Sequence, residues 1–131
     1  MTRTSIIHLL LKIIAAVILL QTLYFKFTAA PESVYIFETL GLEPVGRIGI
    51  GVLELVTAIL LLVSRTTGLG AVLGMGILGG AIFSHLTLLG IEVQNDGGTL
   101  FILALITFAI CCFLAWQHRF EIPILKNLLG K

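Results

Sequence analysis

Four long apolar stretches decide most of what this chain can fold into. They cover residues 6–25, 46–63, 68–89 and 98–116. An α-helix needs about 20 apolar residues to cross a hydrocarbon core of roughly 30 Å. The pattern therefore predicts an all-α fold, in which residues 1–131 form one integral membrane domain built as a bundle of four transmembrane helices.

The composition supports lipid as the surroundings of this bundle. Hydrophobic residues make up 58% of the chain and charged residues 11%, which leaves too few polar side chains to cover a water-soluble globule. The net charge is +1 and no run is rich in Lys or Arg, so no nucleic-acid partner is expected.

The connections between the apolar stretches predict two further features. Residues 64–67 form a link so short that it can join only antiparallel neighbours, so the second and third helices should form a hairpin. In the first connection Pro31 is a helix start, and Val34, Phe37 and Leu40 recur at helical spacing. We expect a short external amphipathic helix there, as a surface tether rather than a lid over the bundle.

The positive charges predict an orientation. Cytoplasmic loops are enriched in Lys and Arg, so the side with more of them is expected inside. An N-in, C-in topology puts only Lys26 and Arg47 outside, and the acidic residues of the loops lie outside as well. The positive residues that it puts inside are Arg3, Lys12, Arg65, Arg119, Lys126 and Lys131.

The first stretch has an alternative interpretation as a secretory signal peptide. Arg3 would be its charged region and Thr28-Ala29-Ala30 its cleavage site. Lys12 and His8 interrupt the start of its core, and the stretch is longer than a signal needs, so a retained helix is favoured.

The third stretch is rich in glycine, with G-x-x-x-G patterns at 70/74 and 76/80. Small residues let helices approach closely in lipid. Packing within the bundle is favoured for them, and a homo-oligomer interface is the alternative. The adjacent Cys111 and Cys112 are expected to pack as small apolar residues rather than to act in redox chemistry.

Polar residues inside membranes are costly and mark functional sites by default. Here they gather from all four helices toward the external side, so we predict a polar ligand-binding pocket in the outer half of the bundle. Its candidate residues are Gln21, Lys26, Arg47, Glu54, His85 and Asp96.

The individual roles within this set stay open. Arg47 and Glu54 share a helix face but lie roughly 10 Å apart along it, too far for an ion pair, so Glu54 needs a partner from another helix. His85, bonded directly or through a water, is the preferred partner over Gln21 and Lys26. Glu54 and His85 either form a site or merely hold helices together, Arg47 should reach lipid headgroups, and Asp96 should first of all form a turn.

No metal or haem site is expected. A bis-His haem needs a second histidine in the membrane at the depth of His85, and His8 and His118 are placed at the opposite face.

The sequence resembles the DoxX and DoxX-like membrane proteins of bacteria. The resemblance is carried by Gly46 to Glu54 (GRIGIGVLE), Gly80 to Val93 (GAIFSHLTLLGIEV), Asp96-Gly97-Gly98 and Lys26, and it extends from about Leu10 to Pro123. It implies a four-helix bundle in the bacterial cytoplasmic membrane. Because the family is named after a subunit of a thiosulfate:quinone oxidoreductase, it also implies a link to quinone-coupled redox chemistry.

We therefore expect an accessory membrane subunit of a quinone-linked redox system, with a pocket for a small amphiphile and a redox protein as partner. The residues themselves identify no cofactor and do not decide whether the chain is an enzyme. A non-catalytic assembly or scaffold protein is the first alternative. A small proton-coupled transporter is the second, and the strong charge bias disfavours it.

Overall fold

The computed structural model describes residues 3–93 and 96–119, and within these ranges the chain is helical with no strand. Its elements are α1 (Arg3–Phe27), α2 (Pro31–Thr39), α3 (Val45–Leu62), the 3₁₀ turn η1 (Ser64–Thr66), α4 (Thr67–Ser84), the π-helical turn η2 (His85–Leu89) and α5 (Thr99–Gln117). Lys126, Lys131 and the end of the resemblance at Pro123 lie outside the described residues.

Four of the helices are long and apolar enough to cross a membrane, which confirms the predicted bundle. They cover Ser5–Phe27, Val45–Leu62, Ser64–Leu89 and Thr99–Gln117. Their bounds differ from the predicted stretches by at most a few residues, because Pro, Gly and charged residues flank each apolar run. The predicted short helix between the first two spans is also present, as α2.

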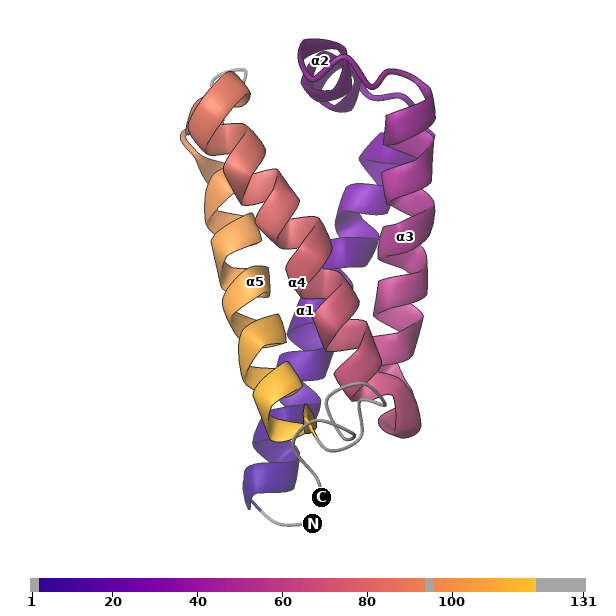
Figure 1. Ribbon diagram of the computed structural model, residues 1–131, viewed down its shortest axis with the longest axis vertical. Helices are drawn as coiled ribbons and strands as arrows, with labels where there is room; N and C mark the ends of the chain where they lie inside the picture. Colours follow the sequence, from indigo (N-terminus) through magenta and orange to yellow (C-terminus); the bar gives the residue numbers. More distant parts are fainter. Residues whose placement is uncertain (1–2, 94–95, 120–131) are drawn as a thin grey trace.

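The four long helices form a ring in which α1 contacts α3, α3 contacts α4, α4 contacts α5, and α5 contacts α1. Figure 1 shows α1 beginning and α5 ending at one end of the bundle, where the α3–α4 turn also lies, and α2 at the other end. We call these the hairpin end and the α2 end. The arrangement leaves open which end faces the cytoplasm, so the N-in, C-in topology stays a prediction.

The buried apolar core lies toward the hairpin end. There the helices are close because small residues meet: a Cβ at Gly70 would lie 2.9 Å from the main-chain nitrogen of Leu61, and one at Gly74 would lie 2.6 Å from Sγ of Cys111. The packing predicted for Gly70, Gly74 and Cys111 is therefore confirmed. Other core residues are Ala15, Ala16, Leu19, Ala58, Ala71, Leu78, Ala104 and Leu114.

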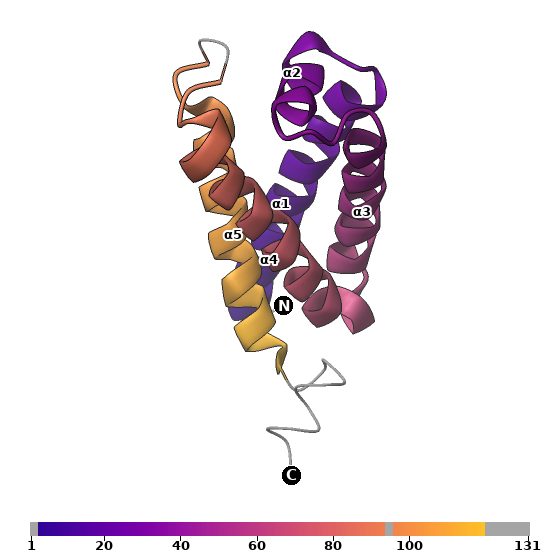
Figure 2. The same cartoon turned by 45° about the horizontal axis from the view of Figure 1, so that its top comes forward.

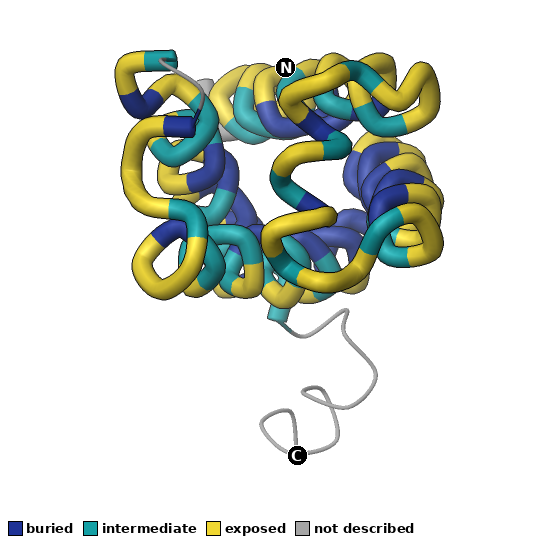
Figure 3. Tube along the Cα trace, turned by 90° about the horizontal axis from the view of Figure 1, so that it is seen from above, coloured by how far each residue is buried: buried dark blue, intermediate teal, exposed yellow. Residues whose placement is uncertain are grey.

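Toward the α2 end the two helix pairs diverge, with α1 and α3 on one side and α4 and α5 on the other (Figures 1 and 2). α2 lies across this end and contacts α1, α3 and η2. Seen along the bundle, buried positions face the interior and exposed positions, mostly apolar, face outward where lipid would cover them (Figure 3).

Candidate functional site

A cavity of about 690 Å³ lies between the diverging helix pairs, and we call it the central cavity. Residues from all five α-helices line it, and α2 closes part of its mouth through Ser33, Ile36, Phe37 and Leu40. The position of α2 over the mouth agrees with the lid, the less favoured of its two predicted roles. Five of the six predicted site residues line the cavity: Gln21, Lys26, Glu54, His85 and Asp96.

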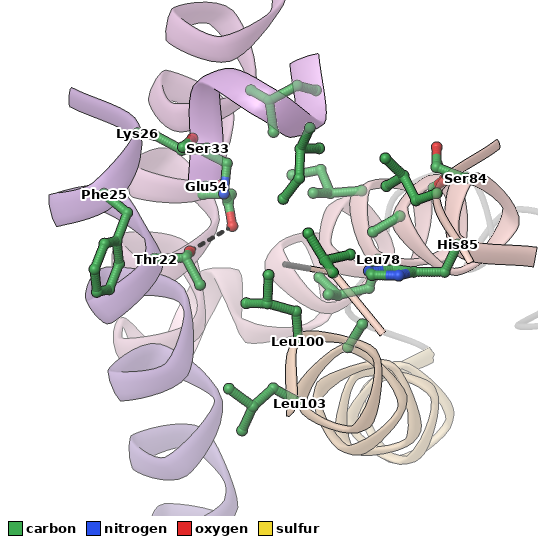
Figure 4. Close-up of a pocket in the computed structure, with 18 of the residues that line it drawn as sticks. Thr22, Phe25, Lys26, Ser33, Glu54, Leu78, Ser84, His85, Leu100 and Leu103 are labelled. Carbon is green, nitrogen blue, oxygen red and sulfur yellow. Dashed lines mark hydrogen bonds and ion pairs between the residues drawn. The ribbon is translucent and has the colours of Figure 1, made fainter. Parts of the chain in front are cut away.

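Glu54 is the centre of a polar cluster on the α1–α3 wall of the cavity. Its Oε1 lies 2.7 Å from Nζ of Lys26, and its Oε2 accepts a hydrogen bond of 2.9 Å from the hydroxyl of Thr22 (Figure 4). The side chain of Glu54 is 5% exposed and that of Lys26 is 15% exposed. In such surroundings each charge is tolerated because the other is present.

The sequence at the contact between α1 and α3 explains why this pair forms. A Cβ at Gly51 would lie 2.7 Å from the ring of Phe27, so the glycine lets α3 press against the end of α1. Thr22 and Lys26 are four residues apart and share one face of α1, which this contact turns toward Glu54. Thr22 was not predicted as a site residue, although its spacing from Lys26 was a usable signal.

Arg47 lies behind this cluster and is not among the residues that line the central cavity. Its Nε donates to both carboxylate oxygens of Glu43, at 2.9 and 3.0 Å, and its Nη1 donates to the main-chain carbonyl of Lys26. The residue is 7% exposed. The expectation that Arg47 reaches lipid headgroups is therefore wrong, because Glu43 and the end of α1 satisfy it inside the protein.

His85 lies on the opposite wall, at the start of η2. Its Nδ1 is 2.9 Å from the carbonyl oxygen of Gly90, and its ring meets the edge of Phe101 at 5.5 Å between centroids. Because a carbonyl can only accept, Nδ1 carries a proton, and in the neutral form of the ring Nε2 is the nitrogen that accepts a hydrogen bond. The backbone of Gly90 has a φ of 80°, a conformation suited to glycine, and so directs its carbonyl at the histidine.

Of the two forms predicted for the pair between Glu54 and His85, direct or bridged by a water, the direct one is wrong. Glu54 pairs with Lys26 and Thr22, whereas His85 bonds to Gly90. Figure 4 shows Glu54 and His85 on opposite sides of the cavity, with Leu78 and Leu100 drawn near its floor. The physical reason is the divergence of α3 and α4 toward the α2 end, which separates the two side chains.

Asp96 fulfils its predicted first role, a turn before the last helix. One carboxylate oxygen accepts from the N–H groups of Val93 and Gly98, at 3.0 and 2.8 Å, and the other accepts from that of Leu100 at 3.1 Å. Burial raises the pKa of Asp96, but these three donors outweigh burial, aided by the positive charge that His85 carries when its ring is protonated, so the pKa of Asp96 is below the ordinary value of 3.8. The negative charge stabilises the N-terminus of α5.

Gln21 is exposed and lines the rim of the cavity on α1. Within residues 3–93 and 96–119, no group of three or more His, Cys, Asp or Glu side chains is placed to hold a metal ion. The cavity thus offers three kinds of polar group: an ammonium with donors to spare, a carboxylate, and an imidazole lone pair.

Comparison of the sequence with known proteins identifies the family of the chain. The model of the DoxX-like family matches residues 10–114, well over half of the chain. No curated protein and no solved structure matches.

Proposed function

Because the chain belongs to the DoxX-like family, we propose that it is an accessory membrane subunit of a quinone-linked redox system. Its central cavity holds the polar ring of a quinone or a similar small amphiphile. Electrons come from a redox protein partner, and this chain binds the ring and exchanges protons with it.

The observation that carries this proposal is the pair of opposed polar walls. Lys26 uses one of its three N–H donors on Glu54 and has others for a ligand carbonyl. The Nε2 lone pair of His85 accepts from a hydroxyl. The two walls match a ring that carries oxygen atoms on opposite sides and alternates between carbonyl and hydroxyl forms.

The size and lining of the cavity also support a small organic ligand. Ligand pockets commonly measure about 300–1,000 Å³ and have apolar walls with a few polar groups, and the central cavity, at about 690 Å³, falls in this range. Ile18, Leu19, Leu78, Leu100 and Leu103 supply the apolar walls.

Native mass spectrometry of the protein, extracted gently from its own membrane, tests the proposal. We expect a bound mass of a quinone, together with a stoichiometric protein partner. A partner without any bound small molecule would favour the second candidate, a scaffold protein. One observation favours that candidate: Gly76 and Gly80 are exposed on α4 and meet no neighbouring atom.

We also propose that the α2 end faces the outside of a bacterial cytoplasmic membrane. The excess of Lys and Arg at the other side supports this orientation. A cysteine placed at Glu38 should react with an impermeant maleimide in intact cells and one at Arg65 should not, in a chain whose own two cysteines are replaced. The opposite labelling would reverse the topology.

A further inference from the structure

The six glycines of the predicted third span divide into packed and open positions. Gly70 and Gly74 face α3 and α5, where an added Cβ would collide with neighbouring atoms. Gly76 and Gly80 are exposed, and a Cβ on either would meet nothing within 4 Å. They are four residues apart and therefore share one face of α4. Internal packing, the predicted role, thus applies to Gly70 and Gly74 but not to Gly76 and Gly80.

Both open glycines line the central cavity, which places them at its edge on α4. Across the opening, α3 contributes Ile50 and Glu54 to the lining. Because Gly76 and Gly80 line the cavity and are exposed, the cavity reaches the outer surface of the bundle along α4. Figure 1 shows α3 and α4 diverging from the hairpin toward the α2 end.

Gly76 also lines a second hollow, which we call the α4–α5 groove. This groove has a volume of about 580 Å³, and its lining is mainly apolar. Its other residues are Val72, Met75, Phe108, Cys112, Ala115, Trp116 and Arg119. These positions lie on α4 and α5 toward the hairpin end, so the groove leads away from the polar walls of the cavity. At Gly76 the two hollows meet over helix backbone.

The two hollows differ in what they can bind. The central cavity contains His85, which is 5% exposed, and Nε2 of its ring has no hydrogen-bond partner among the described residues. It also contains the Lys26–Glu54 pair. The groove offers aliphatic, aromatic and sulfur surface, with Arg119 as a charged lining residue. A molecule that fills both the central cavity and the α4–α5 groove has a polar head and a hydrocarbon tail.

We propose that the ligand enters the central cavity sideways from the bilayer, between α3 and α4, and that its tail crosses α4 at Gly76 into the α4–α5 groove. This inference rests on the proposed function and adds a ligand class to it, a tailed amphiphile dissolved in the membrane. Because Gly76 and Gly80 carry no side chains, the surface of α4 is open there, and this open space is the passage. Because lipid is as apolar as the groove, the passage provides room for the tail rather than extra affinity.

Two probes with the same head test this passage in nanodiscs: a dimethoxymethylbenzoquinone without a tail, and the same ring with a decyl tail. Gly76→Leu and Gly80→Leu place a side chain in the passage without touching the polar walls. We expect them to weaken binding of the decyl compound roughly ten-fold or more, a change of about 1.4 kcal/mol, and to leave the tailless compound unchanged. Gly49→Leu on α3 is the matched control, because Gly49 is also open but lines neither hollow.

A second measurement separates the passage from the identity of the head. A fatty acid with a photoactivatable group in its tail, added to the same nanodiscs, should label Met75 or Phe108 in the wild type and in Gly49→Leu, and much less in Gly76→Leu. If this labelling pattern appears but neither quinone binds, the passage is correct and the proposed function is wrong. Equal effects of Gly76→Leu on both quinones, or labelling that does not depend on Gly76, would overturn the passage.

Discussion

The guanidinium of Arg47 donates to the main-chain carbonyl of Lys26, and in this way α3 holds the end of α1. The ammonium of the same lysine lies 2.7 Å from Glu54, which follows Arg47 by about two turns of α3. One residue of α1 is thus fixed at both its backbone and its side chain by two residues of α3. Arg47 is a positioning residue for the polar wall of the cavity.

Replacing Arg47 with lysine should therefore weaken this wall although the charge is kept. An ammonium cannot reproduce the contact of Nε with both oxygens of Glu43 while also reaching the carbonyl of Lys26. Losing charge-assisted hydrogen bonds of this kind costs about 1.5–3 kcal/mol each. A lower thermal midpoint in detergent is expected for Arg47→Lys, with Arg65→Lys at the exposed turn η1 as the unaffected control. An unchanged midpoint would show that the guanidinium fork is dispensable.

The ion pair between Lys26 and Glu54 should give a strongly non-additive double-mutant cycle. Glu54→Gln or Lys26→Met leaves one buried charge without its partner, which costs about 3–5 kcal/mol. The double variant removes both charges and should recover most of that loss. Equilibrium unfolding in mixed detergent measures all four proteins. Additive losses in the double variant would mean that the two side chains do not depend on each other.

Two neighbouring glycines of α4 should respond oppositely to alanine. A Cβ at Gly74 would lie 2.6 Å from Sγ of Cys111, so Gly74→Ala should cost about 1–3 kcal/mol. Gly76→Ala meets open space and should stabilise the helix by about 0.5–1 kcal/mol. Adding Cys111→Ala to Gly74→Ala should recover part of the loss, since it removes the colliding sulfur. If Gly74→Ala is neutral on its own, α4 and α5 are further apart than described.

Asp96 should make the stability of the α2 end depend on acid pH. Because its pKa in the folded protein is below 3.8, the carboxylate contributes its full stabilisation above that value and loses it as the pH falls through the folded pKa. Asp96→Asn removes the negative charge at the N-terminus of α5 and should cost about 0.3–1 kcal/mol at pH 7. Thermal unfolding between about pH 7 and pH 2 should show a constant gap between the two proteins down to about pH 4, and a gap that closes below it. A constant gap over this range would exclude Asp96 as the source.

The sequence predicts the fold well because the thickness of the membrane determines how long each spanning helix must be. Apolar runs of about 20 residues and the residues that interrupt them determine where helices begin and end, and Pro31 with the helical spacing of Phe37 determines α2. Convergence of the polar residues was also predictable, since intramembrane charges face the bundle interior. Five of the six predicted site residues line the central cavity.

The partners of these residues could not be predicted in the same way. A helix that is apolar on all sides does not reveal which face meets which neighbour. Without the rotation of α1, His85 was therefore preferred to Lys26 as the partner of Glu54, and this preference was wrong. Thr22 was missed because a hydroxyl in an apolar run usually bonds to its own helix, and the Thr22 hydroxyl does lie 2.8 Å from the carbonyl oxygen of Leu19 as well as 2.9 Å from Glu54. The burial of Arg47 depends on its ion pair with Glu43. The i, i+4 spacing of these two residues was a usable signal for this pair, but it was not used in the prediction that Arg47 reaches lipid headgroups.

The central claim is that the cavity holds a quinone ring between Lys26 and His85, and titration of a decyl-tailed benzoquinone into the purified protein tests it most directly. We expect saturable binding to the wild type. His85→Ala removes one hydrogen bond worth about 0.5–1.5 kcal/mol and should weaken binding roughly 3- to 10-fold, whereas Glu38→Gln on the outer face of α2 should bind normally. Absence of saturable binding to the wild type, or equal affinity in His85→Ala, would contradict the account.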